Sequence, residues 1–355
     1  MGTGVQFPPA PPPSFGTPRA CAMPAERMGS ARILKGDIRI GISGWRYAPW
    51  RGVFYPDRLP QRRELEFASR MVPTIEINGS FYSLQRPEYY ARWRDETPPG
   101  FVFAVKAAKY ITHERRLKDV EAPLANFLAS GLFELRDKLG PILWQFPPML
   151  PFKPERFEAF FAMLPQDTEA AARIARGHDE RMTGRVSLDI DRKRPMRHAV
   201  EIRHPSFVDP AFIALLRRYK IALVVADTAG KWPLLEDLTA DFVYVRLHGD
   251  KELYASGYSE EALDRWANRF DRWSRGQQVP DARLASMLPA ARRSRRDVYC
   301  YFDNDVKVHA PYDAASLTRK LGMESPIAER GAPLPEWLAE APRPRAPGFR
   351  KKEMA

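Results

Sequence analysis

Residues 242–248 read Phe242-Val243-Tyr244-Val245-Arg246-Leu247-His248, a short apolar run that finishes in charged and polar side chains. Seven further runs of this kind occur along the chain. They are the segments 38–42, 74–78, 101–106, 141–145, 199–203, 222–227 and 298–304. Stretches of mixed helical and polar character separate the runs, and strands that alternate with helices are typical of a parallel sheet. The sequence therefore predicts an α/β fold, a parallel (β/α)8 barrel of the TIM type.

The chain is expected to form one domain with two tails. The eight runs span residues 38–304, and a barrel of about 250 residues commonly forms a single unit. We expect a leader at 1–36, the barrel at 37–323 and a tail at 324–355. The leader is too rich in proline for a helix, and both tails are expected to be disordered.

Helices are expected where apolar residues recur at helical spacing between the runs. These segments are 61–71, 87–95, 124–139, 154–164, 210–219, 260–273 and 314–321. The long charged segment 166–197 is interpreted as an elaboration of the barrel, with an extra strand at 185–190.

The net charge of +12 raises the question of nucleic-acid binding. Residues 1–36 carry three of these excess positive charges, and residues 343–353 carry four. The excess that remains for the rest of the chain is mild for its length. Solvated tails are therefore favoured over dedicated nucleic-acid arms.

Cysteine content and hydropathy indicate a cytoplasmic protein with no membrane partner. Cys21 lies in the leader and Cys300 inside the last apolar run, so a disulfide between them is not expected. No stretch approaches the roughly 18 consecutive apolar residues of a membrane span. The leader lacks the apolar region of a secretory signal, which is about 7 to 15 residues long.

The ends of the strands predict the functional site. In a barrel of this type the active site lies where the strands finish, so polar side chains at those ends should form one constellation. The predicted constellation contains Glu76, Asn78, Lys106, Gln145, Glu201, Arg203, Asp227, Arg246, His248 and Asp303. Two interpretations stay open, because these charges could equally satisfy one another as structural ion pairs.

The cations of this constellation favour an anionic ligand. Lys106, Arg203 and Arg246 with His248 would form a positive pocket that suits phosphate or carboxylate. Its carboxylates and imidazole are also the ligand types of a divalent metal, but the interleaved cations oppose one, so no metal ligand is assigned. A divalent cofactor stays open and is not favoured.

Aromatic side chains follow the first two strands. Trp45, Tyr47, Phe81 and Tyr82 could stack a base or a sugar face, and packing of a long loop onto the barrel is the alternative. Four familiar motifs are absent: G-x-x-x-x-G-K-[ST], G-x-G-x-x-G, H-E-x-x-H and C-x-x-C. The function must therefore be sought at the strand ends.

Several motifs in order resemble one family. They include Gly41-Ile42-Ser43-Gly44-Trp45, Glu76-Ile77-Asn78-Gly79-Ser80-Phe81-Tyr82, Gln145-Phe146-Pro147-Pro148, Glu201-Ile202-Arg203-His204, Tyr244-Val245-Arg246-Leu247-His248-Gly249 and Tyr301-Phe302-Asp303-Asn304. The chain resembles the YecE-like proteins, domain of unknown function family seventy-two, over residues 38–321. The resemblance implies a TIM-type barrel of bacteria and archaea without an established role. It adds His204 and Asn304 to the expected polar rim, while Asp303 departs from the Asn that is frequent in the family.

Two functions follow as hypotheses. In the first, the rim binds a phosphorylated metabolite, a nucleotide or nucleic acid and supports hydrolase or isomerase chemistry on a phosphodiester or sugar phosphate. Glu76 or Glu201 would be the general base, and His248 would donate or relay a proton. In the second, the protein is a non-catalytic nucleic-acid-binding module, whose affinity would fall steeply with salt.

Overall fold

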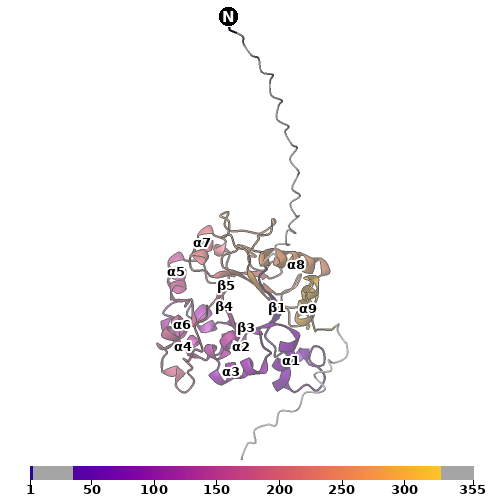
Figure 1. Cartoon of the computed structure of the whole chain (residues 1–355). Helices are drawn as coiled ribbons and strands as arrows, with labels where there is room; N and C mark the ends of the chain where they lie inside the picture. Colours follow the sequence, from indigo (N-terminus) through magenta and orange to yellow (C-terminus); the bar gives the residue numbers. More distant parts are fainter. Residues whose placement is uncertain (3–34, 329–355) are drawn as a thin grey trace, which may run out of the picture. The chain divides into compact units, whose positions relative to one another are not determined.

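The computed structural model describes residues 1–2 and 35–328 of the chain, and within them eight parallel strands form a closed barrel (Figure 1). The strands are paired in chain order, and the last strand pairs with the first. Their bounds are β1 Ile38–Ser43, β2 Thr74–Ile77, β3 Val102–Lys106, β4 Leu139–Gln145, β5 His198–Glu201, β6 Ala222–Asp227, β7 Phe242–Leu247 and β8 Asp297–Phe302. The predicted barrel is confirmed, and the strand bounds lie within two residues of the predicted runs.

Helices surround the strands. In Figure 1 helices α5, α7, α8 and α9 lie on the outside of the ring formed by the strands. The helices are α1 Glu64–Met71, α2 Gly79–Tyr82, α3 Pro87–Glu96, α4 Glu121–Ala129, α5 Pro154–Met163, α6 Thr168–Ala175, α7 Pro210–Arg218, α8 Glu260–Ser274 and α9 Ala310–Lys320. Their apolar faces pack on the outer faces of the strands and form the larger core.

The apolar filling of the barrel consists of aromatic side chains from β7 and β8 and of smaller aliphatic side chains from β3 to β6. Tyr244 on β7 and Tyr301 on β8 lie with their ring centroids 5.1 Å apart. Ala104 and Ala199 face them from β3 and β5. At Gly41 a Cβ atom would lie 1.8 Å from the carbonyl oxygen of Thr74, so only glycine allows β1 and β2 this approach. The interior is therefore packed, and a ligand must bind at its ends.

Two sequence predictions fail in the outer layer. The single helix expected at 124–139 is instead α4 followed by the short helical turns Leu132–Lys138. Gly131 at φ 109° and Arg136 at φ 51° interrupt it, because neither angle is compatible with an α-helix. The strand expected at 185–190 is only an isolated bridge between Ser130 and Ser187.

The connection between β6 and β7 contains no helix in the described structure. Residues 228–241 run as irregular chain, so this flank of the barrel is covered by a loop. No helix within residues 35–328 has both the length and the apolar character that crossing a membrane requires. Cys300 is buried in β8 as a free thiol, while Cys21 and most of the predicted leader and tail lie outside the described residues.

Candidate functional site

Charged side chains gather inside the barrel where the strands finish. Glu76 on β2, Glu201 at the end of β5 and Arg246 on β7 are fully buried, and Asp303 follows β8 directly. Side chains two apart on a strand share a face, so His248 follows Arg246 on the interior side of β7. The geometry thus brings five of the predicted rim residues together.

Arg246 lies at the centre of this cluster. Its Nη2 is 2.9 Å from Glu76 Oε1 and 2.8 Å from Asp303 Oδ2, and its Nη1 is 2.8 Å from Glu201 Oε2. Its Nε donates to Glu76 Oε2 at 3.1 Å, and Nη2 also lies 3.2 Å from Ser43 Oγ. All three guanidinium nitrogens are thus engaged by described residues. Arg246 therefore links its own strand β7 to β1, β2, β5 and the residue that follows β8. Its guanidinium group already has these partners in place of the anion that the sequence had suggested.

The two glutamates accept further hydrogen bonds. Tyr244 Oη donates to Glu76 Oε2 at 2.6 Å. Gln145 Nε2 donates to Glu201 Oε1 at 2.8 Å, and Arg203 Nε donates to the same oxygen at 3.2 Å. A buried charge is stable only when it is paired and hydrogen-bonded, and this condition is met for both side chains.

Electrostatics keep two of these carboxylates ionised. Burial raises the pKa of Glu201, but Arg246 and Arg203 outweigh burial and hold the pKa far below its ordinary value. Burial likewise raises the pKa of Asp303, and Arg246 with His248 reverses the effect. Within residues 35–328 no three His, Cys, Asp or Glu side chains are arranged to hold a metal ion.

A hollow of about 650 Å³ opens beside this cluster at the same end of the barrel. Nine residues predicted from the sequence line it: Trp45, Tyr47, Asn78, Phe81, Tyr82, Lys106, Gln145, Arg203 and Asp303. Glu76, Glu201, Arg246 and His248 are not among its lining residues. The side chains expected to do catalysis are therefore buried behind the wall, where they position the residues that face the hollow.

His248 is connected to the hollow only through its neighbours. Its Nδ1 lies 3.0 Å from Asp303 Oδ2, although the angle does not form a hydrogen bond. Its Nε2 lies 3.4 Å from Arg246 Nη1, and the ring of Tyr254 packs edge-on against it at 5.3 Å. Asp303 and Tyr254 both line the hollow, so they lie between this imidazole and the hollow.

Two residues carried over from the family resemblance make local contacts instead. His204 Nδ1 accepts from the backbone N–H of Ser206 at 3.1 Å and begins the turn Pro205–Phe207. Asn304 Nδ2 donates to Asp313 Oδ2 at 2.7 Å and joins the end of β8 to α9. Neither side chain lines the hollow.

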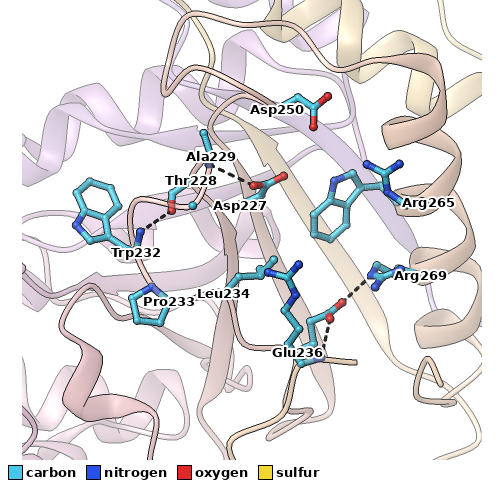
Figure 2. A pocket seen from close by; sticks show the side chains of 13 residues that line it. Asp227, Thr228, Ala229, Trp232, Pro233, Leu234, Glu236, Asp250, Arg265 and Arg269 are labelled. Atoms are coloured by element: carbon cyan, nitrogen blue, oxygen red, sulfur yellow. Dashed lines mark hydrogen bonds and ion pairs between the residues drawn. The ribbon is translucent and has the colours of Figure 1, made fainter. Parts of the chain in front are cut away.

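Asp227 lies at a second hollow on the flank of the barrel (Figure 2). Because Ala226 faces the interior, the next residue of β6 faces outward. Burial raises the pKa of Asp227, and the hydroxyl of Tyr258 donates to it at 3.2 Å. The flank hollow measures about 560 Å³, and Figure 2 shows Asp227, Asp250 and Arg265 around it. Asp227 thus does not belong to the central constellation.

The sequence argument missed several residues that line the hollow. Among them are Arg46, Lys109, His113 and Tyr254. Arg46 lies inside the aromatic segment after β1, where an interleaved cation was a usable signal. His113 lies in the helical turn Tyr110–Glu114, Lys109 directly precedes it, and Tyr254 lies in the loop after β7. Segments this short show no periodicity from which the direction of a side chain could be inferred.

Lys106 is the last residue of β3 and is 9% exposed. Its Nζ lies 4.4 Å from the centroid of the Phe81 ring. Burial, reinforced by the nearby charge of Arg246, lowers the pKa of Lys106 to about 8. Burial and the charge of Lys106 also lower the pKa of His113 to about 4, so this imidazole is neutral at pH 7.

Asp303 has a second acidic neighbour. Burial and the charge of Asp303 raise the pKa of Asp305 well above its ordinary value. Tyr47, which lines the hollow, is hydrogen-bonded to the carbonyl of Ser43. Asp305 therefore keeps its proton to a higher pH than Asp303 does, and the pair offers one proton at the edge of the hollow.

Comparison with known proteins gives one family. The profile described as "Protein of unknown function DUF72" matches residues 39–337. The chain is 32% identical over 123 residues to UPF0759 protein YunF of Bacillus subtilis, covering 33% of this chain and 43% of that protein. It is 28% identical over 181 residues to UPF0759 protein YecE of Escherichia coli, covering 46% of this chain and 61% of that protein. The matches thus span about half the length of these relatives.

Solved structures of two proteins share the fold. A DUF72 family protein from Thermotoga maritima superposes with a TM-score of 0.60 at 23% identity, over 81% of this chain and 99% of that chain. A DUF72 family protein from Enterococcus faecalis superposes with a TM-score of 0.57 at 15% identity, over 84% of this chain and 99% of that chain. At these identities the likeness concerns the fold alone.

Proposed function

This chain belongs to the DUF72 family of unknown function, and we propose that it binds a phosphate-bearing small molecule in the hollow at the strand ends. One observation carries the proposal. Four cationic side chains, Arg46, Lys106, Lys109 and Arg203, line the hollow, while Asp303 is its single lining carboxylate. Such an imbalance in a concave site attracts anions, and phosphate is the common metabolite group that several cations recognise.

The state of the four cations supports this proposal. Lys109 is 3.3 Å from Glu114, and Arg203 pairs with Glu201 and stacks on Trp232. Among the described residues, Arg46 has no ion pair or hydrogen bond through its side chain, and Lys106 has none through its ammonium group. Two cations are thus available to a ligand without breaking a hydrogen bond or an ion pair among the described residues.

Aromatic rings favour a ligand with a ring attached to its phosphate. Tyr82 is 72% exposed and lines the hollow together with Tyr47 and Phe81. Stacking of a base on an aromatic ring is worth about 1–3 kcal/mol in nucleic-acid complexes. A nucleotide or a sugar phosphate meets both requirements, and a short oligonucleotide on the exposed Tyr82 is the second candidate.

The chemistry that suits this site is proton transfer at the edge of the hollow. Asp303 faces the ligand, with Asp305 behind it as a proton carrier and His248 Nδ1 at 3.0 Å from its carboxylate. Glu76 and Glu201 serve to orient Arg246, which in turn orients Asp303. Hydrolase or isomerase chemistry on a phosphorylated substrate would use Asp303 as its base.

The test compares ligands that differ by one phosphate. Binding of AMP against adenosine, and of ribose 5-phosphate against ribose, is measured by calorimetry on the full chain. We expect binding of the phosphorylated member only. Arg46→Ala should weaken it by about tenfold or more, because a hydrogen bond to a charged group contributes about 1.5–3 kcal/mol.

Arg265→Ala is the matched control, because it removes an exposed arginine that lines the flank hollow. It should leave binding unchanged. Equal losses in both variants, or equal binding of a ligand with and without phosphate, would refute the proposed site. Binding of an oligonucleotide alone, with a steep dependence on salt, would favour the nucleic-acid candidate.

A further inference from the structure

Lys106 is placed as a reactive amine and not as an ion-pair partner. It lines the hollow at the end of β3, yet within residues 35–328 no acceptor lies at hydrogen-bond or ion-pair distance from its Nζ. Its close neighbour on one side is the ring of Phe81, at 4.4 Å. An ammonium group held against an apolar surface without a counter-ion loses its proton more easily than one in water.

The neighbouring carboxylates form no ion pair with Lys106, because they are paired with arginines. Glu76 and Glu201 each form a salt bridge with Arg246, and Glu201 forms a second salt bridge with Arg203. Asp303 forms a salt bridge with Arg246, with 2.8 Å between Oδ2 and Nη2. Lys106 is thus a cation beside these carboxylates that has no ion pair among the described residues, and it lines the hollow.

We propose that Lys106 is a nucleophile that forms an imine with an aldehyde or ketone whose other end carries a phosphate group. The inference rests on the proposed function, because the phosphate is what would bring the carbonyl group to Lys106. A desolvated lysine beside another cation is the arrangement that activates an amine for this reaction. Arg246 supplies that second positive charge.

The step balances with groups present at the site. The neutral amine adds through its lone pair to the carbonyl carbon, and the carbinolamine then loses its hydroxyl group. The proton held by the Asp303 and Asp305 pair converts that hydroxyl into water. A protonated imine remains on Lys106 beside ionised Asp303. Such an imine accepts the electron pair of a bond broken at the adjacent carbon, so the class of substrate is a phosphorylated carbonyl compound.

Several charged groups face Lys106 from the surrounding strands and loops. They are Glu76 of β2, His113 after β3, Glu201 and Arg203 at β5, Arg246 of β7 and Asp303 after β8. Burial and Arg246 lower the pKa of Lys106, the three carboxylates oppose them, and the balance is about 8. A large share of the amine is therefore neutral at pH 8, whereas an ordinary lysine has a pKa of about 10.4.

The experiment traps the imine on the full chain. Protein is incubated with glyceraldehyde 3-phosphate or glyceraldehyde and cyanoborohydride at pH 8, digested, and the modified lysines are located by mass spectrometry. Lys109 is the internal control, because it lines the same hollow but its side chain is 43% exposed and lies 3.3 Å from Glu114. We expect Lys106 to be modified at least about tenfold faster than Lys109, as for an activated amine. The rate should rise with pH through about 8.

Matched variants and ligands separate the two proposals. Lys106→Arg should abolish the site-specific modification, and Lys109→Arg should leave it intact. Glycerol 3-phosphate, which has no carbonyl group, tests phosphate binding alone through thermal stabilisation. Stabilisation by this compound without modification at Lys106 overturns the imine and leaves the proposed function standing. Equal modification of Lys106 by both aldehydes overturns the phosphate requirement and with it the proposed function.

Discussion

Two clusters that each combine an arginine with acidic side chains lie at opposite ends of the barrel. At the end where the strands begin, Arg197 pairs with Asp297 at 2.8 Å and Asp241 at 3.4 Å. The side chain of Arg197 is 28% exposed and that of Asp241 46%, whereas Arg246 in the other cluster is 1% exposed. The same residue types therefore form a solvated network at one end and a dry one at the other.

The hollows at the two ends differ in charge more than in size. The hollow beside Arg197 measures about 710 Å³, slightly more than the one beside Lys106. Its lining contains five basic and four acidic residues, whose charges nearly cancel. The hollow at the strand ends is lined by four Lys or Arg residues and one carboxylate. Burial with unbalanced charge, and not volume, distinguishes the candidate site.

The largest expected effect comes from breaking the buried cluster. Arg246→Ala leaves Glu76, Glu201 and Asp303 without their shared cation. Removing one partner of a buried ion pair costs about 3–5 kcal/mol, so we expect the free energy of unfolding to fall by this amount. Urea denaturation followed by circular dichroism measures it. A loss under about 1 kcal/mol, typical of exposed pairs, would show that the two clusters are equivalent.

A smaller effect, of opposite sign, is expected at Lys106. Its pKa is lowered to about 8 in the folded protein, so between pH 8 and the ordinary value the unfolded chain binds one proton more. Stability contributed by this group therefore rises with pH across that window, and the charged amine destabilises the fold below it. Lys106→Met should be more stable at pH 7 by on the order of 2 kcal/mol.

The control for Lys106 is the pH dependence itself. The difference in unfolding free energy between Lys106→Met and the parent chain should shrink as the pH rises from 8 to 10. A difference that is constant with pH would mean that packing, and not charge, explains the effect.

The smallest effect is expected at the solvated cluster. Arg197→Ala should lower the free energy of unfolding by about 1 kcal/mol or less, because water screens the pairs that it removes. The loss should diminish further at high salt. A double-mutant cycle with Asp297→Ala isolates the pair. A salt-independent coupling as large as that of Arg246 would remove the contrast between the two ends.

The barrel could be predicted because its signal is repeated eight times. Each strand is a short apolar run, and the end of each run fixes which rim its polar residues occupy. The ordered motifs also identified the family, and this is confirmed by the match over residues 39–337. Local breaks such as Gly131, with φ 109°, were not predictable, because apolar spacing continues across them.

The site was predictable as a set of residues but not as a set of roles. Alternation along β6 could have excluded Asp227, because its neighbour Ala226 faces the interior. Whether Arg246 or Lys106 is the structural cation depends on which of the two forms salt bridges with the buried carboxylates. That choice depends on the relative positions of strands far apart in sequence, which no local pattern encodes.

The reactivity of the Cys300 thiol reports on whether the barrel is closed. The thiol lies on the outer face of β8, fully buried, and its strand pairs with both β7 and β1. Burial raises its pKa well above the ordinary value, so the closed barrel withholds it from alkylating reagents. In a chain without Cys21, the time at which this thiol stops reacting with an alkylating reagent during refolding would report when β8 packs into the barrel. Its slow reaction in the native state gives the rate at which the seam between the first and last strands reopens.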